Sequence, residues 1–347
     1  PFHLREALGS RLIDRFLERG DEPTARMIRD TISRATVDIP PAMQLAEARL
    51  ELHENRPDQA KAALQAASAL PGPDEAAALV ALIDMDFAAR HPVSADQIAM
   101  LETLAAQNRG QNVAADLRRS LVLAYALSGE FGLAHAGLQD APAAAGNFWA
   151  LMAESGTEAD ILDLAFSPPP DLAAIDASSS VRIAQKLQAL GFPRQALLWL
   201  GVPRNDVATL PDATRMVIAE AQLALFQPRE AIATISGLDT QANPLRARAM
   251  RDLGRPGEAV ALLQANPDAA ADLAVLQRAE RQWEAIAAQP DGAWAKAAGL
   301  AIETSQPLTE PGPVTLAGAT AVAAKAGESR ELLGALLQET QLAAPPP

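Results

Sequence analysis

A three-fold internal repeat between Arg182 and Pro267 places the strongest constraint on how this chain can fold. Each copy reads as an apolar helix, a tight corner and a second helix, and the second helices carry Ala196, Ala231 and Ala259 at matching places. A side chain this small lets two antiparallel helices approach closely, and an apolar residue follows four positions later on the same face. The repeat therefore predicts a stack of helical hairpins.

The same arrangement recurs along the rest of the chain, with less regular spacing. A distance of 35 residues separates Ala25 from Ala60 and also Ala196 from Ala231. Further alanines expected at the equivalent position are Ala134, Ala159 and Ala285. Because a period of this length is typical of helical-repeat proteins, the sequence predicts about nine or ten helical pairs.

The composition favours an all-α array over a deep globular core. Of the 347 residues, 49% are hydrophobic but only 4% are aromatic, and much of the hydrophobic content is alanine. Small side chains suit many shallow helix–helix contacts, and an elongated array is not limited by the size of a single core. The alternating β-branched runs that mark strands are absent from the sequence. We therefore expect an all-α fold.

Three consecutive prolines divide the predicted array into two halves. The run SPPPDLAAIDASSS, which begins at Ser167, cannot be helical at its prolines, and its serines can cap the next helix. We assign residues 1–167 and 171–341 to N-terminal and C-terminal repeats, and residues 342–347 to a proline-rich tail or linker. The last helical pair is expected from about Val314 to Gln341, with its turn at Gly327.

One copy of the repeat resembles the tetratricopeptide repeat, whose unit has about 34 residues. The residues at that family's packing positions are Leu121, Tyr125, Gly129, Glu130, Phe131, Ala134 and Leu138. Pro193, Pro228 and Pro256 stand where the family usually has an aromatic residue, and its first-helix tryptophan is missing. The chain is similar to degenerate, bacterial-type members of the family over most of residues 4–288. This resemblance implies a right-handed superhelical solenoid of antiparallel helix hairpins.

The resemblance also implies a concave groove, lined by first helices, that binds a peptide or helix of a partner protein. The groove positions that it implies are Glu47, Arg119, Gln185, Gln188, Glu220, Arg248, Arg251 and Asp252. Chaperone-binding members of the family clamp a terminal carboxylate with Asn, Lys and Arg, and no such Asn is present here. We therefore exclude that clamp. Trp294 lies in a loosely patterned segment and is expected to be an exposed interface anchor.

The densest basic cluster contains Arg246, Arg248, Arg251 and Arg255. Arg248 and Arg251 are three residues apart and share a helix face, whereas Arg246 lies off that face. One interpretation is ion pairing with acidic neighbours such as Asp252. The other is a fork that binds carboxylates of a partner, because a guanidinium group matches carboxylate geometry better than an ammonium group does.

The charge distribution bears on the class of partner. A formal net charge of −14 and an isoelectric point near 4.8 repel nucleic acid and anionic lipid, so neither is an expected partner. Residues 120–181 contain no Lys or Arg, and their acidic residues are Glu130, Asp140, Glu154, Glu158, Asp160, Asp163, Asp171 and Asp176. This region is either a solvated acidic face or a site for a basic partner.

The sequence contains no set of residues that suits catalysis, a cofactor or a metal. Cysteine is absent, and none of the four histidines has a second ligand at helical spacing. Asp84 and Asp86 point about 200° apart on a helix, so they cannot share a cation without other ligands. No run approaches the roughly 18 apolar residues of a membrane helix. We therefore expect no enzymatic activity, no cofactor, no metal and no membrane insertion.

Together these features predict a protein–protein interaction adaptor or scaffold that holds a partner segment in its groove. One alternative is a self-associating structural component of a bacterial cell-envelope assembly, such as an outer-membrane assembly or a flagellar-motor accessory. Another is an accessory domain of a larger enzyme whose catalytic part lies before Pro1 or after Pro347. The lack of cysteine is compatible with an oxidising compartment, which favours a periplasmic over a cytoplasmic location.

Overall fold

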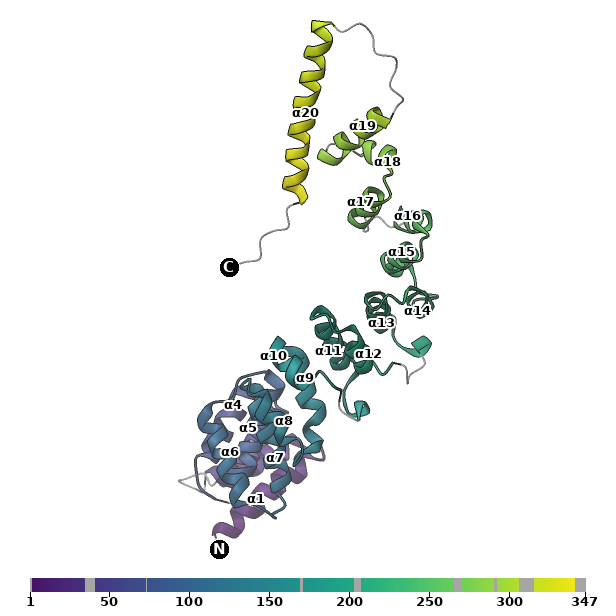
Figure 1. Ribbon diagram of the computed structural model, residues 1–347. Coiled ribbons are helices and arrows are strands. Elements are labelled where there is room, and N and C mark those ends of the chain that lie inside the picture. Colours follow the sequence, from purple (N-terminus) through teal and green to yellow (C-terminus); the bar gives the residue numbers. More distant parts are fainter. Residues whose placement is uncertain are drawn as a thin grey trace. The chain divides into compact units, whose positions relative to one another are not determined.

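The computed structural model describes residues 2–34, 41–72, 74–168, 171–202, 207–264, 270–289, 292–305 and 315–340. All regular elements in these ranges are helices and none is a strand, so the predicted all-α fold is confirmed (Figure 1). The chain divides into two compact units, Pro1–Asn205 and Asp206–Pro347.

The first unit is built from helices, most of which pack in consecutive pairs. Its elements are α1 (Phe2–Leu17), α2 (Glu22–Ser33), α3 (Pro41–His53), α4 (Pro57–Ser68), α5 (Glu75–Ala89), α6 (Ala95–Gln107), α7 (Ala114–Leu127), α8 (Phe131–Gly137), η1 (Pro142–Ala144), α9 (Ala145–Ser155), α10 (Glu158–Leu164), η2 (Leu172–Ala174), α11 (Ala177–Ala189) and α12 (Pro193–Trp199). The odd-numbered helices α1, α3, α5, α7, α9 and α11 also pack successively against one another. Neighbouring hairpins in this unit therefore contact each other through their first helices.

The second unit repeats this pairing. Its elements are η3 (Val207–Thr209), α13 (Asp212–Ala224), α14 (Pro228–Thr234), η4 (Thr240–Ala242), α15 (Asn243–Asp252), α16 (Pro256–Gln264), α17 (Ala270–Ala279), α18 (Trp283–Ala287), α19 (Ala293–Ser305) and α20 (Leu316–Thr340). Helix α13 pairs with α14 and α15 pairs with α16, while α15 also packs against both α13 and α14. Helices α16 to α19 then each pack against the next helix along the chain.

Most corners between paired helices share one backbone geometry. A residue with positive φ stands at eight of them, namely Gly20, Asn55, Arg90, Gly129, Gly191, Phe226, Gly254 and Arg281, whereas Gly156 at the α9–α10 corner has a φ of −60°. The following N–H donates to the carbonyl five residues earlier, as in Phe192 N to Leu187 O at 2.8 Å and Gln227 N to Gln222 O at 2.9 Å. This bond satisfies a carbonyl at the end of the first helix and reverses the chain. Phe226 adopts a φ of 58° that bulky residues rarely tolerate, so the corner geometry is imposed there against local preference.

The small residues that follow these corners are buried as predicted. The fully buried alanines at this position are Ala25, Ala60, Ala134, Ala196, Ala231 and Ala259, each with 0% exposure. Their N–H groups make the first helical bonds of the second helix, for example Ala196 N to Phe192 O at 3.1 Å. The apolar residues four positions after Ala60, Ala196, Ala231 and Ala259 are buried too, including Ile235 at 0% and Leu263 at 3%. The hairpin prediction from the sequence is therefore confirmed at these corners.

Two of the weaker assignments are wrong in register. Ala159 is exposed, and the buried position of α10 belongs to Ile161, because the side chain of Thr157 caps the helix and sets where it begins. Ala285 is only half-buried, and Ile286 takes the buried place five residues after the positive-φ residue Arg281. Both errors arise because the position is set by the corner, and isoleucine as well as alanine can fill it.

The predicted turn at Gly327 is also wrong. Helix α20 runs without a break from Leu316 to Thr340 and includes Gly327, while Val314 and Gln341 lie outside the described residues. A glycine inside a helix costs only about 1 kcal/mol relative to alanine. The strong helix formers on both sides of Gly327 outweigh that cost.

An aromatic cluster forms part of the core of the first unit. Trp149 and Trp199 are 2% and 1% exposed, and their ring centroids lie 4.9 Å apart in an edge-to-face arrangement. The indole Nε1–H of Trp199 donates to the carbonyl of Ala165 at 2.6 Å. Trp199 is therefore a core residue. These contacts join α9 to α12, so helices on both sides of the triple-proline run pack together within one unit.

Candidate partner-binding surface

The arginines on the first helices of the second unit fall into two groups, and the first group serves the fold. Arg215 on α13 donates from Nε to Thr234 O at 2.8 Å and from Nη2 to Ser236 O at 2.6 Å. Arg246 on α15 donates from Nη2 to Ile235 O at 3.1 Å. Helix ends leave carbonyl groups without intrahelical partners, and cations are favoured there. Arg215 and Arg246 therefore hold the end of α14, which agrees with the prediction that Arg246 lies off the binding face.

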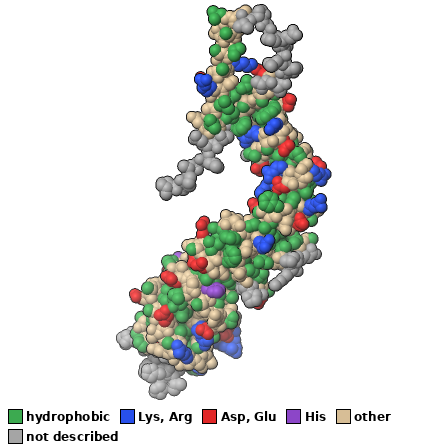
Figure 2. All heavy atoms as spheres, in the orientation of Figure 1, with side chains coloured by type: hydrophobic (Ala, Val, Ile, Leu, Met, Phe, Trp, Pro, Cys, Tyr) green, Lys and Arg blue, Asp and Glu red, His purple; other side chains and the backbone are tan. Residues whose placement is uncertain are grey.

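The second group faces solvent. Arg248 on α15 is exposed, and among the described residues it makes no hydrogen bond or ion pair. The equivalent residue on α13, Glu220, is exposed and also lacks a partner within the described ranges. Within the described part of the chain, Arg251 pairs with its neighbour Asp252 alone, at 3.0 Å from Nη2 to Oδ1. In Figure 2, Lys and Arg side chains gather over the segment that Figure 1 labels α15 and α16.

Arg248 and Arg251 line a hollow of about 280 Å³ that also involves α16 and α17. Ala247, Leu263 and Leu276 form its apolar wall, and these three residues are at most 6% exposed. The remaining lining residues are Pro244, Asp272 and Val275, of which Val275 is 53% exposed. The hollow thus combines two guanidinium groups with a buried apolar surface.

Trp294 on α19 is half-buried. The guanidinium carbon of Arg278, on α17, lies 4.9 Å from the centroid of its ring. A cation over an aromatic face is attracted by the ring quadrupole, so part of this indole is already occupied. Trp294 is therefore less available to a partner than its sequence context suggests.

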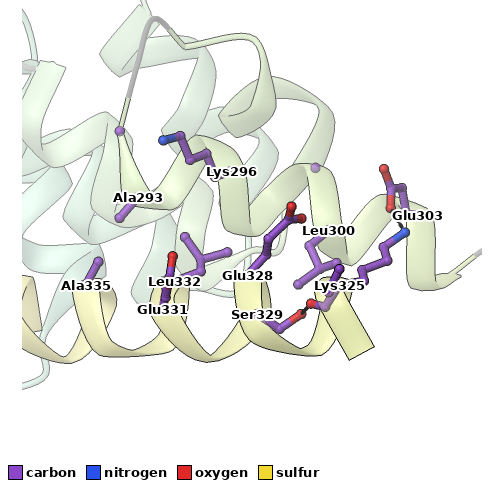
Figure 3. Close-up of a pocket in the computed structure, with 13 residues that line it drawn as sticks. Ala293, Lys296, Leu300, Glu303, Lys325, Glu328, Ser329, Glu331, Leu332 and Ala335 are labelled. Carbon is purple, nitrogen blue, oxygen red and sulfur yellow. Dashed lines mark hydrogen bonds and ion pairs between the residues drawn. The ribbon is translucent and has the colours of Figure 1, made fainter. Parts of the chain in front are cut away.

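A second and larger hollow, of about 1390 Å³, lies between α19 and α20 (Figure 3). Lys325 on α20 donates from Nζ to Glu303 Oε2 on α19 at 2.5 Å, and this bond raises the pKa of Lys325. Only three described positions of α20 are half-buried, namely Ser329, Leu332 and Leu336. The remaining described positions are exposed, so α19 covers one stripe of this helix.

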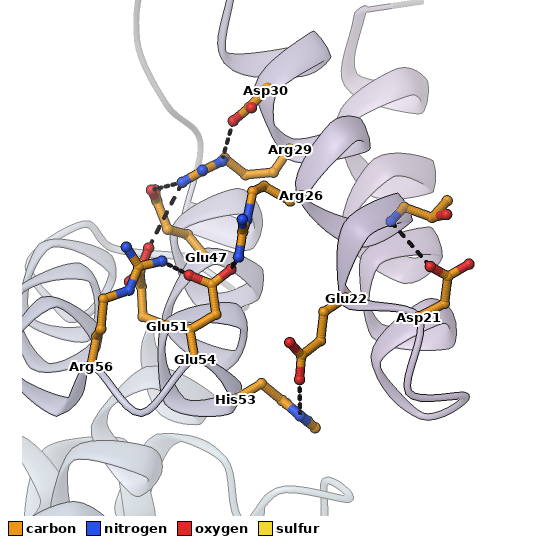
Figure 4. Close-up of polar contacts among 11 residues, drawn as sticks. Asp21, Glu22, Arg26, Arg29, Asp30, Glu47, Glu51, His53, Glu54 and Arg56 are labelled. Atoms are coloured by element: carbon orange, nitrogen blue, oxygen red, sulfur yellow. Dashed lines mark hydrogen bonds and ion pairs between the residues drawn. The ribbon is translucent and has the colours of Figure 1, made fainter.

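Glu47, on α3, belongs to an ion-pair network with α2 and α4 (Figure 4). The Nη1 atom of Arg29 lies 2.9 Å from Glu47 Oε1 and 3.8 Å from Glu51 Oε1. Arg56 lies 2.7 Å from Glu51 through Nε and also pairs with Glu54. Glu51 is only 5% exposed, and a buried carboxylate needs such partners. Glu47 is therefore engaged in holding the first two hairpins together.

Arg119, on α7, is likewise engaged within the fold. Its Nη2 atom lies 2.9 Å from both carboxylate oxygens of Asp84 on α5, and this hydrogen bonding raises the pKa of Arg119. Asp86 is 2% exposed and accepts from Lys61 Nζ at 2.7 Å, beside a hollow of about 320 Å³. The two aspartates therefore belong to different ion pairs, as their spacing on a helix predicts.

Gln185 and Gln188, on α11, differ in their surroundings. Gln185 is exposed, and in the described part of the chain it has no hydrogen-bond partner. Gln188 is half-buried, and its Nε2 is inaccessible to solvent and has no acceptor among the described residues. Lys186, between them, donates to Gly156 O at 2.8 Å, and burial lowers its pKa. Of these three residues, Gln185 alone offers its side chain freely to solvent.

Several acidic residues between 120 and 181 have structural roles. Asp160 completes the capping box of α10, and Asp171 caps η2. Asp176 caps α11 and accepts from Ser178 and Ser179, and these hydrogen bonds lower its pKa to about 2. Glu154 pairs with Arg90 at 2.9 Å. Half of the acidic side chains in this stretch therefore have an internal role, which leaves fewer carboxylates for a basic partner.

Within the described residues, no group of three or more metal-ligating side chains is brought together. None of the described helices combines the length and the apolar character that a membrane span requires. No protein-family model matches the chain, and no curated protein matches its sequence.

Sequence reasoning singled out Arg248 and Arg251 but missed the α17 side of their hollow. Asp272, Val275 and Leu276 lie in the segment AADLAVLQRA, which reads as an ordinary apolar helix. The rotation of that helix about its axis places Leu276 in the core and leaves Val275 53% exposed at the edge of the hollow. No local signal in the sequence reveals that rotation, because it depends on packing against α16.

Proposed function

We propose that the chain is a non-enzymatic adaptor or scaffold whose stacked hairpins form a right-handed, tetratricopeptide-like solenoid. In this proposal the first helices of successive hairpins line a groove, and a segment of a partner protein binds along it. Two observations on the fold support the solenoid: the shared corner geometry, and the packing of first helix against first helix.

The observation that carries the binding function is the contrast between used and unused side chains on α13 and α15. Arg215 and Arg246 are taken up by carbonyl groups of the fold, whereas Glu220 and Arg248 are exposed and without a partner within the described ranges. Helices α13 and α15 pack against each other, so these unused groups lie on neighbouring elements. An acceptor beside a guanidinium group suits a polar protein segment better than a polyanion.

Cross-linked capture from cells that express the chain tests this proposal with a pair of matched variants. The double variant Arg248→Glu/Arg251→Glu should lose partner proteins that the wild type captures, because reversed charge repels the same carboxylates. The control Arg229→Glu reverses one charge on α14, where Arg229 is exposed on a second helix. If all three proteins capture the same set of partners, binding does not use the first helices of the second unit and the proposal fails.

Self-association is the second candidate, and the exposure of α20 favours it. Leu316, Val322 and Leu333 are 87%, 70% and 60% exposed on this helix. Apolar residues spaced along one helix are typical of surfaces that another helix covers. Light scattering over a range of concentrations separates the two candidates, because a chain that stays monomeric at high concentration does not assemble through α20.

A further inference from the structure

The hollow between α15, α16 and α17 has the size of a site for one side chain. Its volume is about 280 Å³. Sites that enclose whole drug-sized molecules usually occupy roughly 300–1,000 Å³. A single large apolar residue of a partner fits the smaller space better than a separate ligand does.

The lining of the hollow determines what that side chain must be. Ala247, Leu263 and Leu276 have hydrocarbon side chains and are at most 6% exposed, so they form the apolar floor of the hollow. Val275, 53% exposed, extends this surface toward the rim. Removing apolar surface from water is favourable in proportion to the area covered. An aliphatic or aromatic side chain is therefore favoured over a polar one.

The charged residues at the edge of the hollow determine which group must lie beside that apolar side chain. Arg248 has no ion partner in the described part of the chain, while Arg251 is already paired with Asp252. Asp272 also lines the hollow, and no ion pair joins it to Arg248 within the described ranges. The formal charges of these two arginines and two aspartates sum to zero. Arg248 can therefore pair with one carboxylate of a partner, but the edge of the hollow does not attract a polyanion such as nucleic acid.

We propose that this hollow binds a partner segment in which a bulky apolar residue enters the cavity and a nearby Asp or Glu pairs with Arg248. This inference rests on the proposed adaptor function and names the chemistry of the segment that the adaptor binds. Free guanidinium groups form short, charge-assisted hydrogen bonds with carboxylates. An apolar residue bound beside such a pair fixes the position of the partner segment on the surface.

A random-peptide display selection on the purified chain of 347 residues tests this proposal. Enriched peptides should contain Asp or Glu within a few residues of Leu, Ile, Met or Phe. A labelled, selected peptide is then titrated by fluorescence anisotropy against the wild type, Arg248→Ala, Val275→Asp and the control Arg229→Ala. Both substitutions in the hollow should weaken binding by about tenfold or more, because each removes a group that contacts the peptide. The control should bind like the wild type, and circular dichroism should show equal helicity in all four proteins.

The possible results separate the two levels of the proposal. If selected peptides bind with the same affinity to Arg248→Ala and Val275→Asp, the hollow is not the site, although the adaptor function stands. If Lys in place of the acidic residue leaves the affinity unchanged, or if a single-stranded oligonucleotide displaces the peptide, the assigned chemistry is wrong. If no peptide is enriched above an unrelated control protein, both the hollow and the adaptor function are overturned.

Discussion

Replacing Ala231 with leucine should open the α13–α14 hairpin, because this residue sets how closely the two helices approach. Ala231 has 0% exposure and packs in a cluster with Ala219, Leu223 and Ile235. Leucine adds three carbon atoms at a fully buried place between packed helices. Overpacking of this kind typically costs about 1–3 kcal/mol, since neighbouring side chains must leave their preferred rotamers.

A matched control lies two residues further along the same helix. Ala233 is exposed, so leucine there enters no contact, and leucine is nearly as good a helix former as alanine. The expected change for Ala233→Leu is within about 0.5 kcal/mol. The comparison therefore isolates packing from helix propensity.

Hydrogen exchange of the backbone amides in α13 and α14 is a suitable assay, because it reports the opening free energy of this hairpin separately from the rest of the chain. Ala231→Leu should lower that free energy by about 1–3 kcal/mol, a roughly 5- to 150-fold faster exchange when exchange follows the opening equilibrium. Equal protection in Ala231→Leu and Ala233→Leu would refute the idea that a small residue at the corner controls hairpin packing.

Two further predictions concern single groups in the first unit. Trp199→Phe should destabilise this unit by about 1–3 kcal/mol in urea denaturation, because it leaves the carbonyl of Ala165 without the 2.6 Å donor, and an unchanged unfolding midpoint would show that water satisfies that carbonyl. Asp176→Ala should cost about 1 kcal/mol through loss of the α11 N-cap, whereas Asp176→Asn should cost less because it can still accept from Ser179. The folded-state pKa of Asp176 is about 2 against an ordinary value of 3.8, so its contribution is complete above pH 4 and is lost as pH falls toward 2. Acid titration of the wild type and Asp176→Asn should therefore diverge in that range, and parallel curves would contradict the assignment.

Residue type alone does not identify which polar residues of the candidate surface are available to a partner. Glu47 and Arg119 have the polar character expected of groove residues, yet both are half-buried and held in ion pairs with Arg29 and Asp84 on neighbouring helices. Those partners lie 18 and 35 residues away in the sequence, so no local pattern reveals the pairing. Arg248 keeps its side chain free because no acidic residue of a neighbouring helix reaches it within the described residues.

The sequence by itself determined the all-α class and the place of six corners, because the burial of a small residue there follows from helix geometry and leaves a repeated mark. It failed at Ala159, Ala285 and Gly327, where capping by Thr157, the Arg281 corner and the length of α20 decide the outcome. The tertiary structure alone decided which arginines are used inside the fold. A guanidinium group finds its partner through space, on whichever carbonyl or carboxylate the packing of helices brings near, and that distance is absent from the order of residues along the chain.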